Sequence, residues 1–289
     1  MDSDPAWQEF LKTEAQVHFV RIGEHRLRVV EIGSGEPVLL VHGFADSVYT
    51  WHRNLRALAR TGFRALAYDQ PGCGESALPT GCDFGVDSLA RLATRLMDTL
   101  GIAQAHLVGS SMGGGIGLQL AVHHPDRLRR VVLVAPTCYH ALFRPFIYLL
   151  RYPPFGPLAR HLSGPWLAEP ILYSLYGDPT LLTPAVLAQY RRAFQRPEYR
   201  YACVGLLRDY WNHAFAETST LSRNYRKIRV PLHLVWGELD SWIGTHQALR
   251  LAADTGADLT VIAKAGHLVQ QARPRPFNET VVRFLKSEH

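Results

Sequence analysis

Residues 105–124 read AHLVGSSMGGGIGLQLAVHH, and this stretch decides the fold class. The apolar run Ala105–Val108 is followed by GSSMG at 109–113, and then by a helical pattern over Ser111–His123. A G-x-S-x-G motif between a strand and a helix is typical of a sharp turn that lifts the serine hydroxyl out of the sheet. Free N–H groups at the start of the helix favour negative charge nearby. The pattern predicts that Ser111 is a nucleophile at the carboxyl edge of a sheet.

The other strands share one pattern: short runs rich in β-branched and aliphatic residues, bounded by turn residues. We predict strands at Val17–Ile22, Leu27–Ile32, Pro37–Val41, Arg64–Tyr68, Ala105–Val108, Arg130–Val134, Leu232–Trp236 and Leu259–Ile262. The internal ones are apolar throughout rather than at alternate positions, which is typical of parallel strands covered by helices on both faces. The sequence therefore predicts an α/β fold with an eight-stranded, mostly parallel sheet that begins with an antiparallel pair.

Helical patterns alternate with these strands, except in one long interruption. We expect helices at Trp51–Arg60, Val86–Leu100, Ser111–His123, Thr245–Ala253 and Pro276–Lys286. Residues 136–230 are too many for a simple connection between strands, so we expect them to form an inserted helical cap, with the core made by residues 1–135 and 231–289. Within this cap, helices are expected at Pro157–His161, Trp166–Leu175, Pro184–Gln195 and Glu198–His213.

The composition allows a large buried core and excludes several classes of protein. The chain has 289 residues, of which 47% are hydrophobic and 19% charged. Its net charge of +6 comes without a long basic run, a helix-turn-helix or zinc-finger spacing, so we expect no nucleic-acid partner. No apolar stretch approaches the roughly 18–20 residues of a membrane helix, and the acidic N-terminus lacks the regions of a secretory signal. We expect a cytoplasmic monomer or homodimer without stable membrane insertion, its four cysteines reduced.

A serine needs a base to act as a nucleophile, and the end of the chain offers one. In enzymes with this type of turn, the acid precedes the histidine in the sequence. Asp240 follows the strand Leu232–Trp236, and His267 follows the strand Leu259–Ile262. Both residues are therefore expected on loops that leave the same sheet edge as Ser111. We predict that Ser111, His267 and Asp240 form a catalytic triad.

Several motifs together resemble the α/β-hydrolase fold family, over essentially the whole chain except the cap. They are GSSMGG at 109–114, HGF at 42–44, DQPGCGES at 69–76, WGELD at 236–240 and AGHLVQ at 265–270. The resemblance implies that Ser111 is the nucleophile, His267 the general base and then acid, and Asp240 the group that orients His267. It also implies an oxyanion hole formed by the backbone N–H groups of Phe44 and Met112.

Other polar residues in these motifs are expected to have structural roles. We expect His42 to hydrogen-bond within its own region and Asp69 to brace the loop that it begins. Glu238 is an alternative acid, but the resemblance places the acid at Asp240. The family more often has Arg where Gln70 stands, a departure that we expect to be harmless. The histidines lack the spacing of metal ligands, so we expect no metal and no cofactor.

The identity of the nucleophile narrows the chemistry. Epoxide hydrolases and haloalkane dehalogenases of this family use an aspartate at the position of Ser111, so the resemblance implies acyl transfer to water. We expect hydrolysis of carboxylic esters with small to medium apolar acyl groups. The alternative is hydrolysis of a carbon–carbon bond, because the GSSMGG turn and the tail GHLVQQARPRPFNETVVRFL resemble meta-cleavage product hydrolases. Leu268 departs from that pattern, since those enzymes usually carry Trp after the histidine.

Lactonase, thioesterase, acyltransferase and perhydrolase activities use the same triad and stay open, as does a non-catalytic role in ligand binding. The cap is expected to decide the substrate by excluding water over Ser111. For a small, ester-like substrate we expect contacts with Phe44, Met112, Leu268 and, from the cap, Trp211. A cap arginine is a further candidate for binding a substrate carboxylate.

Overall fold

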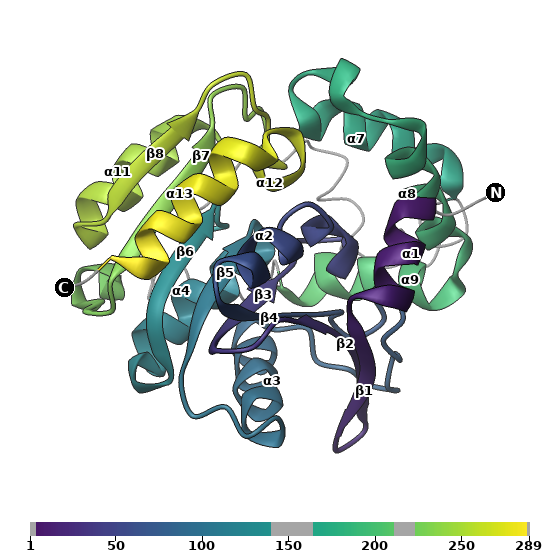
Figure 1. Ribbon diagram of the computed structural model, residues 1–289, viewed down its shortest axis with the longest axis horizontal. Helices are drawn as coiled ribbons and strands as arrows, with labels where there is room; N and C mark the ends of the chain where they lie inside the picture. The colour runs from purple at the N-terminus through teal and green to yellow at the C-terminus, as the bar shows by residue number, and fades with distance from the viewer. Residues whose placement is uncertain (1–3, 140–163, 211–222, 288–289) are drawn as a thin grey trace.

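The structure is a computed structural model that describes residues 4–139, 164–210 and 223–287 (Figure 1). Its sheet has eight strands in the order β1-β2-β4-β3-β5-β6-β7-β8. The strands are β1 (Gln16–Ile22), β2 (His25–Ile32), β3 (Glu36–Val41), β4 (Phe63–Tyr68), β5 (Ala105–Ser110), β6 (Leu128–Val134), β7 (Leu232–Gly237) and β8 (Asp258–Ile262). Strand β2 is antiparallel to both β1 and β4, whereas the other neighbouring pairs are parallel. The predicted eight-stranded, mostly parallel sheet is confirmed.

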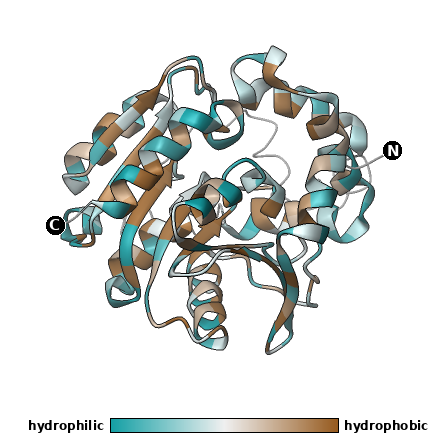
Figure 2. Cartoon of the chain, in the orientation of Figure 1, coloured by the Kyte–Doolittle hydropathy of each residue, from teal (hydrophilic) through white to brown (hydrophobic). Residues whose placement is uncertain are grey.

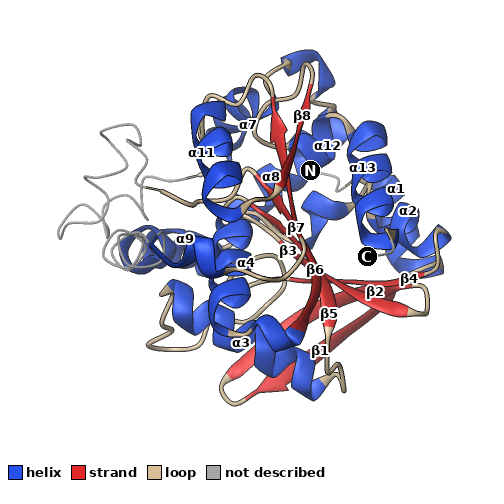
Figure 3. Ribbon diagram, turned by 90° about the vertical axis from the view of Figure 1, so that its left-hand side faces the viewer, coloured by secondary structure: helices blue, strands red, loops and turns tan. Residues whose placement is uncertain are grey.

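Helices lie on both sides of the sheet (Figure 3). Those outside the insertion are α1 (Pro5–Thr13), α2 (Leu55–Arg60), α3 (Val86–Thr99), α4 (Met112–His123), α11 (Thr245–Thr255), α12 (Val269–Ala272) and α13 (Pro274–Lys286). Between β6 and β7, the insertion contributes α7 (Ala168–Tyr176), α8 (Pro184–Gln195), α9 (Pro197–Gly205) and a π-helical turn (Leu206–Tyr210). None of the helices in the described ranges is long and apolar enough to cross a membrane.

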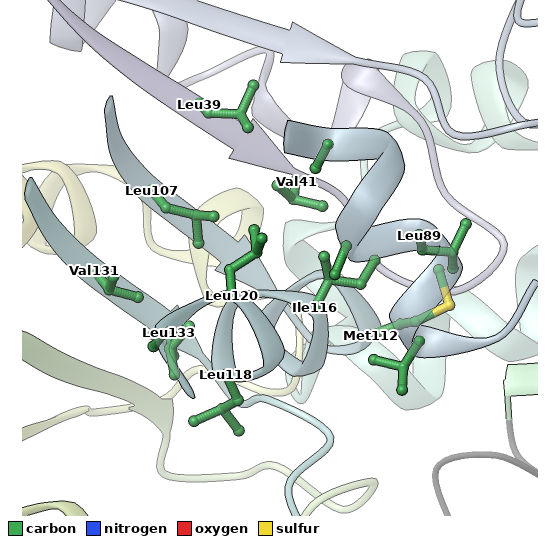
Figure 4. Close-up of a cluster of buried hydrophobic side chains, with 14 of the residues drawn as sticks. Leu39, Val41, Leu89, Leu107, Met112, Ile116, Leu118, Leu120, Val131 and Leu133 are labelled. Carbon is green, nitrogen blue, oxygen red and sulfur yellow. The ribbon is translucent and has the colours of Figure 1, made fainter. Parts of the chain in front are cut away.

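Side chains of successive strand residues enter two different hydrophobic layers, which explains why the inner strands are apolar throughout. On β3, Leu39 and Val41 pack in a cluster with residues of α3, α4 and α11, part of which Figure 4 shows. Val38 and Leu40 instead belong to the cluster that includes residues of α1, α2 and α13. Several strands of the sheet are accordingly coloured largely brown, the hydrophobic end of the scale, in Figure 2.

The helix predicted at Trp51–Arg60 is wrong in its first turn. The chain forms a short 3₁₀ helix at Val48–Trp51, turns, and begins α2 at Leu55. Tertiary contacts hold this turn, because the Asn54 side-chain amide donates to the Gln270 carbonyl oxygen at 3.2 Å. Such contacts come from residues far along the chain, so a local sequence pattern cannot reveal them.

The insertion agrees with the predicted helices where the structure describes it. Helix α8 has the predicted bounds, and α7 begins at Ala168 because Pro165–Leu167 forms a 3₁₀ turn instead. The predicted helix Glu198–His213 starts one residue early, at Pro197, and becomes π-helical from Leu206. The predicted helix Pro157–His161 and the residues from 211 to 213 lie outside the described residues.

Candidate active site

Ser111 occupies the sharp turn between β5 and α4, as predicted. Its backbone has φ 55° and ψ −117°, a conformation that a residue with a side chain rarely adopts. The glycines of the motif make the turn possible, because a Cβ on Gly109 would lie 2.4 Å from the Gly113 carbonyl oxygen. A Cβ on Gly113 would lie 2.2 Å from the Val41 carbonyl oxygen. Ser111 is therefore held in a strained conformation, with its neighbours packed backbone against backbone.

The predicted acid and base form a buried pair. His267 Nδ1 lies 2.8 Å from Asp240 Oδ2, and the exposed fraction is 5% for the histidine side chain and 0% for the aspartate side chain. The other carboxylate oxygen, Oδ1, accepts backbone N–H groups from Trp242 at 2.8 Å and from Ile243 at 3.0 Å. Because an ionised carboxylate only accepts hydrogen bonds, Nδ1 of His267 is the donor in this contact.

Glu238, the alternative acid, has a different place. Its side chain is exposed, and Oε2 accepts the backbone N–H of Lys264 at 2.9 Å. This contact joins the loop after β7 to the loop after β8. Glu238 therefore braces the two loops that carry Asp240 and His267, and the geometry supports Asp240 as the partner of the histidine.

The histidine loop is also tied to α7 in the insertion. The backbone N–H groups of Gly266 and Leu268 donate to the carbonyl oxygens of Tyr176 and Leu175, at 2.9 Å and 3.1 Å. In addition, the Trp242 ring is stacked near His267, with centroids 6.4 Å apart. The position of His267 thus depends on backbone contacts with the insertion as well as on its own strand.

The loop after β3, which carries the predicted oxyanion-hole residue Phe44, lies against the serine. A Cβ on Gly43 would be 3.1 Å from Ser111 Cβ, so only glycine allows this approach without displacement. His42 fixes the loop: Nε2 accepts the Gln70 backbone N–H at 3.0 Å, so Nδ1 donates to the Gly43 carbonyl oxygen at 2.8 Å. The Gln70 side chain donates to the His42 carbonyl oxygen at 2.9 Å. His42 and Gln70 therefore have structural roles.

Asp69 braces the neighbouring loop. Its carboxylate accepts the backbone N–H of Val48 at 2.7 Å and that of Glu75 at 2.9 Å, and the guanidinium of Arg28 lies 3.7 Å away. The residue is fully buried, and all of these contacts are within the protein scaffold. They agree with the loop-bracing role expected from the sequence.

Ser111 and His267 open into one cavity of about 240 Å³ between the sheet edge and the insertion. Its floor is formed by loops that follow strands, and its roof by α7, α8, α9 and the π-helical turn. Most of the lining is apolar. The lining includes Phe44, Leu167, Ile171, Leu172, Phe194, Leu207, Trp242 and Leu268, together with the polar residues Asp46, Thr137 and Arg200.

The predicted contact residues have different outcomes. Phe44 and Leu268 line the cavity. For Met112 the expectation of a side-chain contact is wrong: the first turn of α4 directs this side chain into the core, where it is 1% exposed and packs in the cluster that contains Leu89 and Ile116 (Figure 4). This correction does not concern the backbone N–H of Met112, whose place in the oxyanion hole stays a prediction. Trp211 lies outside the described residues.

Sequence reasoning missed several residues of the cavity wall. Trp242 stands only two residues after Asp240, a proximity that offered a signal. Asp46 and Thr137 follow β3 and β6 within a few residues, so the rule that sites form at the carboxyl ends of strands could have found them. Arg200 lies on α9, and no strand position points to it. Among the residues that the structure describes, no three His, Cys, Asp or Glu side chains gather as a metal site.

Comparison with known proteins identifies the family. The family model described as alpha/beta hydrolase fold matches residues 36–274, and the chain therefore belongs to the α/β-hydrolase fold family. This is the family that the sequence motifs resemble. Relatives of the chain that are named as hydrolases support a hydrolase activity for this fold.

The similar proteins include enzymes with several named reactions. A 2-hydroxy-6-oxononadienedioate/2-hydroxy-6-oxononatrienedioate hydrolase of Burkholderia vietnamiensis is 28% identical, over 95% of this chain and 96% of its own length. A 2-hydroxy-6-oxo-6-phenylhexa-2,4-dienoate hydrolase of Comamonas testosteroni is 29% identical, with 89% and 90% covered. Among solved structures, the enol-lactonase from Burkholderia xenovorans LB400 has a TM-score of 0.80 and 26% identity, with 93% and 100% covered.

Proposed function

We propose that this protein is a serine hydrolase that cleaves carboxylic esters with small to medium apolar acyl groups. The observation that carries the proposal is the buried contact of His267 with Asp240, at the wall of the same apolar cavity as Ser111. Asp240 keeps the proton of His267 on Nδ1, so Nε2 is available to take the proton of the serine hydroxyl.

The reaction would proceed in two halves. Ser111 Oγ attacks the ester carbonyl while His267 takes its proton, and His267 then gives that proton to the departing alcohol. A water molecule, activated by the same histidine, attacks the acyl-enzyme and releases the acid. In both halves the negative oxygen of the tetrahedral intermediate would accept hydrogen bonds from the backbone N–H groups of Phe44 and Met112, each worth about 3–4 kcal/mol of transition-state stabilisation.

The proposed acyl preference rests on the size and polarity of the cavity. A volume of about 240 Å³ suits a small-molecule substrate rather than a polymer, and Ile171, Leu172 and Phe194 make its roof apolar. In this proposal residues 136–230 act as the cap that excludes water, and residues 1–135 and 231–289 act as the catalytic core. Leu268 and Phe44 would contact the acyl group from the floor.

A second candidate is hydrolysis of a carbon–carbon bond in a meta-cleavage product, a substrate that carries a carboxylate. Two observations favour it. The two relatives named above as hydrolases act on 2-hydroxy-6-oxo di- or trienoates, according to their names. The guanidinium-bearing residue Arg200 lines the cavity, where a cation would attract a substrate carboxylate. Leu268 favours ester hydrolysis, because meta-cleavage product hydrolases usually carry Trp at the position after the histidine.

The experiment that tests the proposal compares both substrate classes on one preparation. Turnover of p-nitrophenyl esters of increasing acyl length is measured beside turnover of 2-hydroxy-6-oxo-6-phenylhexa-2,4-dienoate, with Ser111→Ala and Arg200→Gln as variants. An ester hydrolase turns over short and medium esters, loses this activity with Ser111→Ala and keeps most of it with Arg200→Gln. Preferential turnover of the dienoate, with a large rise in KM for Arg200→Gln, would establish the second candidate instead.

A further inference from the structure

Two tyrosines of the insertion hold the loop after β3 that contains Phe44, which is called the oxyanion loop below. We propose that these residues, Tyr190 and Tyr199, are positioning residues for the oxyanion hole. The inference rests on the proposed function, since it assigns the Phe44 N–H a role in stabilising a negative oxygen. It adds that the insertion does more than shape the cavity: two of its hydroxyl groups set the backbone geometry of the loop that contains Phe44.

The first contact acts on the residue after Phe44. Tyr199 Oη, on α9, donates to the Ala45 carbonyl oxygen at 2.5 Å. Ala45 has φ 50°, in the left-handed region that residues with a side chain seldom adopt, and the contact with Tyr199 helps to hold its peptide in this conformation. The tyrosine side chain is buried, and burial raises its pKa well above the usual value. The hydroxyl therefore stays protonated and remains a donor.

The second contact acts one residue further on. Tyr190 Oη, on α8, lies 2.8 Å from Asp46 Oδ1, which also accepts the backbone N–H of Ser47 at 2.8 Å. Tyr190 is the donor in its hydrogen bond with Asp46, because Gln271 Nε2 donates to the same Tyr190 oxygen at 2.7 Å. An amide nitrogen only donates, so the tyrosine proton must point to Asp46.

Further hydrogen bonds hold Gln271 in this orientation. Its Nε2 also donates to Thr50 Oγ1 at 2.8 Å, and its Oε1 accepts the Tyr176 hydroxyl at 2.9 Å. All three partners are buried. A buried network of this kind, with each donor matched to an acceptor, is rigid and sensitive to the loss of one member. Tyr190 connects this network to the oxyanion loop through its hydrogen bond to Asp46.

The two contacts matter because an oxyanion donor works only within a narrow geometry. Donors must lie within roughly 0.5 Å of the productive position to stabilise the developing charge. Ala45 and Asp46 directly follow Phe44, and the two tyrosines that hold them stand 154 and 144 positions away in the sequence. The position of the Phe44 N–H therefore depends on where α8 and α9 pack against the core.

The test removes one hydroxyl at a time. Tyr199→Phe and Tyr190→Phe are compared with Tyr225→Phe, a matched control whose buried hydroxyl also donates to a backbone carbonyl, that of Cys138, at 2.8 Å. For p-nitrophenyl butyrate, we expect kcat to fall about 10-fold in each of the first two variants, and KM to change less than about two-fold. The loss of kcat is smaller than that caused by removing an oxyanion-hole donor, because the donor is displaced rather than deleted. The rate of Ser111 phosphonylation should fall in parallel. The control should keep both rates.

Three results would overturn the inference: losses of kcat no larger than in Tyr225→Phe, a change confined to KM, or unchanged phosphonylation. A readout independent of activity is amide hydrogen exchange in the peptide that contains residues 43–47. Exchange should quicken in both variants but not in the control, and unchanged exchange contradicts the inference even in a protein without esterase activity. Inactivity of the unmodified protein toward every ester, with the exchange result as expected, would overturn the proposed function alone.

Discussion

The floor and the roof of the cavity are built in different ways. The floor carries Ser111 and His267 on loops that leave β5 and β8, and these loops are held by hydrogen bonds and by glycine contacts that leave no room for a Cβ. The roof presents apolar side chains such as Ile171 and Phe194 from helices. Under the proposed function, the difference teaches that the reacting groups come from the floor and that the apolar side chains of the roof select the substrate. Changes in the floor should affect kcat strongly, and changes in the apolar side chains of the roof should affect substrate preference, whereas Tyr190 and Tyr199 belong with the floor because their hydroxyl groups contact its loop.

The largest effect is expected from the nucleophile. Ser111→Ala removes the attacking oxygen, and kcat for the best ester should fall by about 10⁶-fold, the scale for removing the serine of a triad. The assay is ester hydrolysis, and an unchanged circular-dichroism spectrum controls for folding. Substantial residual turnover in the folded variant would mean that the floor has another nucleophile.

The orienting acid should come next. Asp240→Asn offers an amide N–H where His267 Nδ1 needs an acceptor, so the histidine adopts the wrong tautomer and kcat should fall about 10⁴-fold. Glu238→Gln is the matched control, because Glu238 is exposed and contacts only the loop backbone of Lys264 in the described contacts. The kcat of this control should change less than about two-fold. Equal losses in both variants would contradict the assignment of the acid.

The third prediction concerns the reactivity of the Cys203 thiol, which lines the cavity from α9 in the roof. Burial raises the pKa of this thiol from 9.0 to about 12. At pH 8 a thiol with the higher pKa has about 10³-fold less thiolate, so alkylation by iodoacetamide should be slower than in the unfolded chain by about that factor. Mass spectrometry of the Cys203 peptide, with and without denaturant, measures it. Rapid alkylation in the native protein would show a roof open to solvent.

The smallest effect is expected from the apolar side chains of the roof. Ile171→Ala enlarges the cavity and removes an apolar contact, which should raise KM for a butyryl ester about 10-fold and leave kcat for the acetyl ester within about two-fold. Steady-state kinetics across acyl lengths measure both. A loss of kcat at every acyl length would break the separation between roof and floor.

The same difference explains what the sequence reveals. The floor is recognisable because its elements are local: a glycine motif forces the turn at Ser111, and Asp240 and His267 each follow an apolar strand within a few residues. The roof depends on packing between helices that have no fixed spacing to the triad. Arg200 thus became visible as a cavity residue only in three dimensions. Met112 illustrates the opposite error, since adjacency to the serine in sequence does not direct a helical side chain into the cavity.

The most direct test of the central claim is covalent labelling of the nucleophile. The protein is treated with a p-nitrophenyl alkylphosphonate, digested and analysed by mass spectrometry. We expect one phosphonyl group per chain, on Ser111, with no labelling of Ser111→Ala and much slower labelling of Asp240→Asn. Labelling at another residue, or ester turnover by a protein whose Ser111 remains unlabelled, would contradict the account.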